Sequence, residues 1–253
     1  MGFLEWGLIA IIGIHILLDV IMAFYTRLAK KVDDYLLSKA SVTFGANKET
    51  TIQTTIPEKK SCLRRLLSTI YYTINPYIYG LMRYRLICLG KIPSAHIRNF
   101  KYRAIYNMQI TKNTVIYGGC EIRSPWNIHA DRCVISTYCI LDGRAGIFFD
   151  QDVVLGSGVH IWTEEHNIND SFFSVLPENR APVHIGEHAW VCSDSTILPG
   201  VSIGEGCVIA SRACVTHNTD SFSVYGGIPA KKIKQRNTDL RYKLNGKPTW
   251  HFF

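Results

Sequence analysis

From residue 110 onward the chain places an aliphatic or aromatic residue at every sixth position. The repeat holds for six positions, resumes after an insertion for three, and after a longer interval continues for six more: Ile110, Ile116, Ile122, Ile128, Val134, Ile140, Phe149, Leu155, Ile161, Ile185, Val191, Ile197, Ile203, Ile209 and Val215. Four residues after most of them the side chain is again small or apolar, as at Cys120, Val159 and Ala189. A hydrophobic content of 47% would not produce such a register by chance.

A stride of six fits neither the 3.6-residue period of a helix nor a series of hairpins, but it fits a parallel β-helix with triangular coils. Each aliphatic residue then points inward and stacks on its equivalent one coil away, as Ile185 on Ile203. Glycines in corner segments such as "IGEH" and "LPGV" allow the backbone to turn. The pattern predicts a mainly β fold of about five coils, and the flat sides of such a prism favour a homotrimer.

Two hydrophobic segments precede the repeat. Residues 6–25 are long enough to cross a bilayer as a helix, and Arg27, Lys30 and Lys31 follow at once, which predicts that the downstream chain is cytoplasmic. His15 and Asp19 lie four residues apart on one helical face, where they can pair or face another helix. A hydrophobic helix that packs inside an oligomer fits the same pattern, and both interpretations stay open.

Residues 38–60 are polar and threonine-rich, as in a linker, and residues 63–92 combine helical spacing of apolar residues with arginines and an interrupting Pro76. This basic stretch fits the headgroup region of an anionic membrane or a helical cap on the next domain. The expected organisation is a hydrophobic N-terminal helix (1–35, membrane anchor or oligomer-packing), a linker with basic amphipathic helices (36–97), the repeat domain (98–236) and a C-terminal tail (237–253).

Composition narrows the partners only slightly. The formal net charge of +8 suits a nucleic acid, an anionic membrane or a phosphate-bearing small molecule until the charges are located. The eight cysteines form no CxxC pair and no compact cluster with histidines, so neither a zinc module nor a disulfide scaffold is indicated. We interpret them as reduced thiols of a cytosolic domain that mostly fill small core positions.

Four features together resemble the hexapeptide-repeat O-acetyltransferases: the repeat itself, the loop "IWTEEHN", the run "AWVCSDSTILPGVSIGEGCVIASRACVT" and the closing "GGIPAKKIK". The similarity covers roughly residues 98–236 and is greatest to enzymes of capsule and exopolysaccharide synthesis of the colanic acid type and to galactoside and maltose acetyltransferases. It implies a left-handed parallel β-helix, acetyl-CoA as co-substrate and a carbohydrate acceptor, with no metal and no nucleic acid. A hexapeptide run alone would also fit nucleotidyltransferase domains and γ-type carbonic anhydrases.

Transfer of an acetyl group from a thioester to an alcohol requires a base for the hydroxyl proton and stabilisation of the oxyanion. A histidine suits the first role because a neighbouring carboxylate can orient it. His166 follows the coil that ends at Ile161 and matches the family's catalytic histidine, with Glu164 and Asp170 as candidate orienting groups. Asp142 resembles a position where relatives contact the acceptor sugar, and Arg144 is either an acceptor-site donor or a corner residue.

The resemblance also assigns a groove for acetyl-CoA. Its expected residues are Trp190, Ser193, Ser211, Thr216 and His217, with Lys231 and Lys234 on the phosphates. Relatives commonly carry lysine where this chain has His217. A zinc site built from His160, His166, His184 and His188 is the weaker alternative, because their spacing does not place them on one surface.

The sequence thus predicts an acetyl-CoA-dependent O-acetyltransferase at the cytoplasmic side of the cell membrane. It would act on a sugar hydroxyl of a surface polysaccharide or lipid-linked glycan precursor. The alternatives are a cytoplasmic enzyme for a small soluble acceptor, such as an amino acid or xenobiotic, and a non-catalytic β-helix scaffold of a membrane complex.

Overall fold

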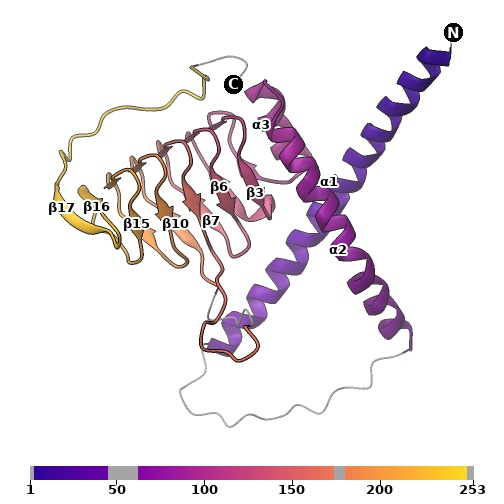
Figure 1. Ribbon diagram of the computed structural model, residues 1–253, viewed down its shortest axis with the longest axis horizontal. Coiled ribbons are helices and arrows are strands. Elements are labelled where there is room, and N and C mark those ends of the chain that lie inside the picture. The colour runs from indigo at the N-terminus through magenta and orange to yellow at the C-terminus, as the bar shows by residue number, and fades with distance from the viewer. Residues whose placement is uncertain (1–2, 45–61, 174–179, 250–253) are drawn as a thin grey trace.

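In the described part of the chain, three helices precede the repeat domain (Figure 1). The computed structural model describes residues 3–44, 62–173 and 180–249, with side chains in 6–34, 73–173 and 180–249. The helices are α1 (Phe3–Phe44), α2 (Cys62–Gly90) and α3 (Ala95–Ala104). Helix α1 therefore extends into the segment expected as linker, and residues 45–61 of that segment lie outside the described residues. Pro76 lies inside α2, so the helix continues through it and is not interrupted there.

The repeat domain is a prism of three parallel sheets. The first face contains β1 (Gln109–Ile110), β4 (Ile128–Ala130), β7 (Ile147–Phe149), β10 (Val183–Ile185) and β13 (Ser202–Ile203). The second contains β2 (Val115–Ile116), β5 (Val134–Ile135), β8 (Val154–Leu155), β11 (Trp190–Val191), β14 (Val208–Ile209) and β16 (Ser223–Gly226), with β17 (Lys231–Gln235) antiparallel at its end. The third contains β3 (Glu121–Arg123), β6 (Ile140–Asp142), β9 (His160–Ile161), β12 (Thr196–Ile197) and β15 (Cys214–Val215).

The left-handed parallel β-helix is thus confirmed, with five complete coils and the start of a sixth in the described residues. The predicted stacking is also correct: Ile185 pairs with Ile203, and Val191 with Ile209. The positions four residues later form a second row inside the prism, where Cys120, Cys133, Cys139 and Cys207 are buried among other small residues. Burial raises the pKa of the Cys133 thiol to about 12, as befits a core residue.

The inward positions that the six-residue count predicts are wrong in the second coil. Ile135 and Leu141 are fully buried there, whereas Val134 and Ile140, which the six-residue count placed inside, are only half-buried. A short 3₁₀ helix, η1 (Pro125–Asn127), lengthens the preceding corner. Because of it Ala130 rather than Ile128 pairs with Ile110, and the next inward positions shift by one residue.

Helices α1 and α2 cross each other beside the first coils (Figure 1). Met22 of α1 and Met82 and Leu86 of α2 are buried in the same core cluster as the prism. Polar contacts fix the crossing: Asp19 accepts from Arg85 and, at 2.8 Å, from Lys101, and the Thr26 hydroxyl donates to the Ile105 carbonyl at 2.8 Å.

The N-terminal part of α1 makes few such contacts. Large apolar residues are exposed on all its sides, including Trp6, Leu8, Ile9, Ile11, Ile12, Ile14, Ile16 and Leu17. By length and composition, α1 is the one helix in the described chain that could cross a membrane, over Trp6–Asp34.

The C-terminal tail runs back along one edge of the prism toward α3 (yellow in Figure 1). The Tyr242 hydroxyl donates to the His188 carbonyl at 3.0 Å, the Leu244 amide donates to Asp152 at 2.7 Å, and the Thr249 amide donates to the Tyr117 hydroxyl at 2.9 Å. The tail therefore links the late coils to the first one.

Candidate functional site

His166 lies in the loop that leaves the third face after β9. Its Nδ1 is 2.8 Å from the carbonyl oxygen of Phe173, and its ring stacks on the Phe173 ring with centroids 4.2 Å apart and planes 4° from parallel. A carbonyl can only accept, so Nδ1 carries the proton and donates it. In the neutral form of the ring, Nε2 then keeps its lone pair, which is the state that a general base requires. The imidazole is exposed and therefore open to a substrate.

Glu164 closes the neck of this loop. Its two carboxylate oxygens lie 2.8 Å from Nη1 of Arg144 and 3.0 Å from Nε of Arg180. The Ala181 amide also donates to the Thr163 carbonyl at 3.1 Å, so the two ends of the loop are held together. Glu164 thus faces arginines on both sides, and a direct orienting role toward His166 stays a prediction.

Asp170 shapes the turn that carries Phe173. Its carboxylate accepts from the Phe172 amide at 3.3 Å, and its carbonyl accepts from the Phe173 amide at 2.9 Å. In this way Asp170 supports the residue whose carbonyl and ring hold His166. Its predicted role in orienting the imidazole remains a prediction, and this turn offers an indirect route to it.

Asp142 and Arg144 form a joined pair at the same edge. Asp142 is fully buried, and its carboxylate accepts from Nε and Nη2 of Arg144 at 2.8 and 2.6 Å. These hydrogen bonds raise the pKa of the Arg144 guanidinium, with the Glu164 charge adding to the effect. Arg144 joins Asp142 to Glu164 and lies between the buried carboxylate and the surface, and its role as an acceptor-site donor stays a prediction. Contact of Asp142 with an acceptor stays a prediction.

The residues predicted for acetyl-CoA occupy two edges of the prism and its end. Trp190 is 46% exposed on the second face, and Ser193 and Ser211 follow β11 and β14 at the next edge, where the Arg212 amide donates to the Ser193 carbonyl at 3.0 Å. Thr216 and His217 contact each other at 2.8 Å on the edge from which the His166 loop departs.

The two predicted lysines, Lys231 and Lys234, are exposed on β17. Neither has an ion pair among the described side chains, whereas the intervening Lys232 is paired with Asp220 at 2.8 Å. The structure therefore leaves the two selected lysines available to an anion. Their assignment to phosphates is a prediction.

The four histidines of the zinc alternative are not brought together. His160 contacts Trp162 edge to face on the third face, and His184 stacks on Phe148 on the first. His188 lies at an edge with Asp152 and Glu187, with their ligand atoms within 4.8 Å of one another. Asp152 is already paired with Arg132 at 2.7 Å, and His188 Nε2 lies 3.0 Å from the Tyr242 carbonyl.

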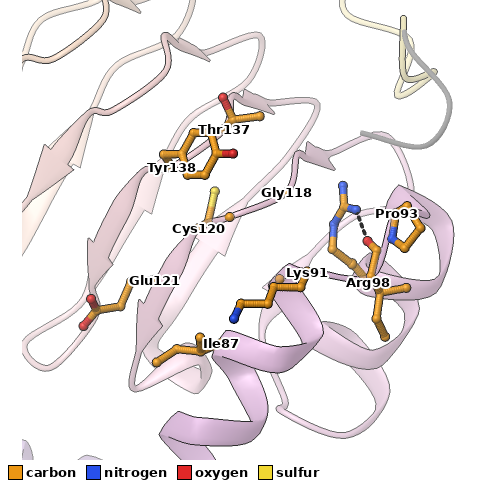
Figure 2. A pocket seen from close by; sticks show the side chains of 12 residues that line it. Ile87, Lys91, Pro93, Arg98, Gly118, Cys120, Glu121, Thr137 and Tyr138 are labelled. Atoms are coloured by element: carbon orange, nitrogen blue, oxygen red, sulfur yellow. Dashed lines mark hydrogen bonds between the residues drawn. The ribbon is translucent and has the colours of Figure 1, made fainter.

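Two cavities lie where the helices meet the prism. The larger, about 600 Å³, is at the end of α2 and is lined by residues including Ile87, Lys91, Arg98, Cys120 and Tyr138 (Figure 2). It contains none of the predicted site residues. The smaller, about 210 Å³, includes Arg144 and Arg180 in its wall and so adjoins the neck of the His166 loop.

Sequence reasoning missed Phe173 and Arg180. Phe173 holds His166 through a backbone carbonyl and a ring stack, and no periodic pattern marks it within "DSFFSV". Arg180 binds Glu164 from the far end of the loop, and only the antiparallel pairing of the two loop ends could have indicated it.

Comparisons with known proteins agree with the fold. The family model described as bacterial transferase hexapeptide (six repeats) matches residues 182–217. A chloramphenicol acetyltransferase of Agrobacterium fabrum is 31% identical over 119 residues, which are 44% of this chain and 54% of that protein, and one of Klebsiella aerogenes is 42% identical over 26% of this chain and 31% of that protein. The putative colanic acid biosynthesis acetyltransferase WcaF of Escherichia coli is 25% identical over 54% of this chain and 76% of its own length.

Two solved structures share the prism. A hexapeptide-repeat acetyltransferase of Vibrio cholerae complexed with acetyl coenzyme A has a TM-score of 0.55 at 18% identity, covering 64% of this chain and 90% of that one. A maltose O-acetyltransferase of Clostridium difficile has a TM-score of 0.50 at 22% identity, covering 65% and 91%. The family model thus matches the repeats at residues 182–217, and the two solved structures share the β-helix fold of the prism.

Proposed function

We propose that this protein is an acetyl-CoA-dependent O-acetyltransferase that modifies a sugar hydroxyl of a surface polysaccharide or lipid-linked glycan precursor. The observation that carries the proposal is the state of His166, whose Nδ1 is committed to the Phe173 carbonyl so that Nε2 can accept a proton. The acetyltransferases among the relatives support the reaction class, and the colanic acid protein supports a glycan acceptor.

In the proposed reaction Nε2 of His166 takes the proton of the acceptor hydroxyl as its oxygen attacks the thioester carbonyl. The carbon–sulfur bond then breaks, the acetyl group stays on the sugar, and the leaving thiolate takes the proton from the imidazolium. The Phe173 carbonyl stabilises the doubly protonated ring between these steps, because it accepts from Nδ1 throughout. A covalent acyl-enzyme is not required.

We also propose a homotrimer, which the distribution of the candidate site residues supports. The His166 loop leaves the edge after the third face, whereas Trp190, Ser193 and Ser211 lie on the second face and the edge beyond it. Neighbouring prisms would bring such separate edges together, so that acetyl-CoA lies between subunits with Lys231 and Lys234 near its phosphates.

We further propose that the protein is attached to the cytoplasmic face of the membrane through α1. Its exposed apolar surface covers all sides of the first turns and continues on one side through Phe24 and Leu28. Tyr84 of α2 and Phe100 of α3 are large apolar residues that are exposed as well. Water disfavours this much contiguous apolar surface, whereas lipid accommodates it.

Replacement of His166 tests the mechanism. His166→Ala should lower acetyl transfer about 10²- to 10⁴-fold, as loss of a general base does, while acetyl-CoA binding and the oligomeric state stay unchanged. His96→Ala is the control, because His96 is an exposed histidine of α3 outside the site. Thiol release from acetyl-CoA with purified glycan acceptors measures the rate, and near-normal turnover of the His166 variant would refute the proposed mechanism.

A small soluble acceptor is the second candidate, favoured by the chloramphenicol acetyltransferases among the relatives. The two can be separated by mass spectrometry of surface glycans from cells with and without the protein, alongside an acetylation assay with chloramphenicol. Loss of glycan acetyl groups supports the first, and chloramphenicol turnover with unchanged glycans supports the second.

A further inference from the structure

The smaller cavity lies between the two N-terminal helices and the prism, and we call it the helix–prism cavity. Its volume is about 210 Å³. Its walls include Tyr25 from α1, Asn75 and Tyr79 from α2, and Ser124 and Trp126 from the first coil. Arg144 and Arg180 complete it on the side of the His166 loop.

Three polar groups of this cavity have no hydrogen-bond partner among the described residues. The Tyr25 hydroxyl donates to Oδ1 of Asn75 at 2.9 Å, which fixes the amide and leaves its Nδ2 unused. The hydroxyls of Tyr79 and Ser124 are likewise unpaired, although Ser124 is only 5% exposed. None of the three atoms is among the buried unsatisfied atoms of the described residues, so each is open to the cavity. They are therefore accessible to a molecule bound there.

The backbone conformation of Ser124 is a second feature that supports a ligand site. Ser124 adopts the left-handed conformation, with φ 44° and ψ 59°, immediately before η1. A non-glycine residue pays a conformational cost for this geometry, and such residues concentrate at ligand sites. The strained corner brings the Ser124 hydroxyl and the Trp126 indole into one wall.

Two guanidinium groups and three carboxylates surround the cavity, so it carries no excess of positive charge. The guanidinium of Arg144 is bound by Asp142 and Glu164, and that of Arg180 by Glu164. Asp33 accepts from the Trp126 indole nitrogen at 2.7 Å. Because no cation is left without a carboxylate, the cavity has little preference for an anion and instead offers neutral hydrogen-bonding groups.

Aromatic rings supply the rest of the surface. Tyr25 and Trp126 meet edge to face with centroids 6.4 Å apart, and Tyr79 lies beside them. The electron-rich faces of such rings attract polarised C–H groups, while amides and hydroxyls bind alcohols. A pyranose ring presents both kinds of group.

We propose that the helix–prism cavity binds one neutral pyranose unit of the acetyl acceptor, so that α1 and α2 form a wall of the acceptor site. The proposal rests on the O-acetyltransferase function proposed above. The connection to the reaction runs through Arg144 and Arg180, which both hold Glu164, two residues from His166. Sequence positions 25, 75 and 79 thereby become determinants of acceptor specificity.

The cavity is also close to the surface proposed to meet the membrane. Leu28 is the last exposed large apolar residue in the described part of α1, and the next residue, Ala29, lines the cavity. A sugar on a lipid carrier could therefore reach it without leaving the bilayer surface. A soluble glycoside presents the same pyranose, so the test uses both forms.

Ligand-observed saturation-transfer NMR on the full chain in phosphatidylglycerol nanodiscs tests the proposal. The probes are methyl glycosides of glucose, galactose, mannose and N-acetylglucosamine, the octyl glycosides of the same sugars at submicellar concentration, and glucose 1-phosphate. At least one neutral glycoside should bind, and Tyr79→Phe and Ser124→Ala should each weaken it about three- to tenfold, as loss of one hydrogen bond does. Tyr77→Phe, in an exposed tyrosine of α2, should leave it unchanged.

The proposal would be overturned if the wild type and the three variants, Tyr79→Phe, Ser124→Ala and Tyr77→Phe, bound the glycosides equally well. It would also be overturned if the wild type bound no neutral glycoside. Tenfold tighter binding of glucose 1-phosphate than of the neutral sugars would do so too, because it would mean that an anion is recognised. Tighter binding of octyl than of methyl glycosides identifies the lipid-borne source, and equal binding identifies the sugar alone.

The same variants separate this proposal from the proposed function. If acetyl transfer occurs and depends on His166, but Tyr79→Phe leaves the KM for the acceptor unchanged, only the cavity assignment is wrong. If glycosides bind as expected while no acetyl-CoA is bound or turned over, the cavity assignment stands and the acetyltransferase function fails.

Discussion

Glu164→Gln is the sharpest test of how the structure holds the His166 loop. The substitution keeps the shape of the side chain and removes its charge. One amide oxygen can still accept from one arginine, but the amide nitrogen then faces the N–H groups of the other. Arg144 keeps its two hydrogen bonds to Asp142, and Arg180 keeps its bond to the Arg144 carbonyl at 3.0 Å. The neck is therefore weakened without losing either arginine.

The size of the effect follows from the burial of the three side chains. A hydrogen bond to a charged group contributes about 1.5–3 kcal/mol. Glu164 is 12% exposed and Arg144 31%, but Arg180 is 42% exposed, so solvent screens one of the two pairs. We expect a loss of about 2 kcal/mol at the neck, which corresponds to roughly a 30-fold rise in the open population.

Limited proteolysis of the loop at residues 162–181 measures that population, because cleavage follows the open fraction when reclosing is fast. Glu165→Gln is the matched control, since Glu165 is an exposed carboxylate of the same loop. The Glu164 variant should also lower kcat while the KM for acetyl-CoA stays constant. Equal cleavage of the two variants, with equal kcat, would show that the arginine-held neck does not position His166.

Three further outcomes are expected. Ile135→Ala should lower the free energy of unfolding by about 2–5 kcal/mol, and Val134→Ala should lower it clearly less, because only Ile135 is fully buried. Similar urea midpoints for the two variants would contradict the assignment of Ile135 to the core. Burial opposes ionisation of Asp152, but the hydrogen bonds from Arg132 and the Leu244 amide hold the pKa of this carboxyl group below its ordinary value. The stabilisation that the Asp152 carboxylate gives to the folded state is therefore complete above about pH 4. It is lost as the pH falls through the lower pKa of the folded state. Hydrogen exchange should show the tail loosening in that acidic range, and in Asp152→Asn already at neutral pH; a tail equally protected in both proteins throughout would argue against this link. The full chain should partition with membranes and resist extraction by high salt, as burial of the apolar surface of α1 in lipid requires; complete release by salt alone would exclude the anchor.

Much of the prism could be predicted because its core follows one rule. An inward side chain recurs with the coil, so the aliphatic positions alone give the fold, the stacking partners and the number of coils. The rule fails between Ile122 and Phe149, where η1 adds residues to a corner. The sequence "RSPWN" does not indicate how many residues the corner takes. The two neighbouring candidates for the next inward position, Val134 and Ile135, are both apolar. Burial distinguishes them only once the chain is folded.

The residue types of the candidate site could be predicted from the sequence, but the hydrogen bonds and ion pairs between them could not. A histidine among carboxylates suggests an orienting carboxylate, yet the group that holds Nδ1 of His166 is a backbone carbonyl. Every residue has such a carbonyl, so sequence offers no way to select Phe173. Glu164 is the converse case, because its nearest partners, Arg144 and Arg180, lie 20 and 16 positions away and are joined to it only by the coil and the loop.

The docking of α1 follows a sequence pattern that the hydrophobic periodicity obscures. Asp19, Thr26 and Asp33 are spaced seven residues apart, which places them on one side of a helix, two turns from one another. Each has a defined partner: Arg85 and Lys101 for the first, the Ile105 carbonyl for the second, and the Trp126 indole for the third. Polar contacts at three heights fix both the rotation and the axial position of α1, which hydrophobic packing alone would leave free to slide. A helix fixed in this way is an integral wall of the domain, and its opposite side, with Phe24 and Leu28 exposed, is the surface that we propose meets the membrane.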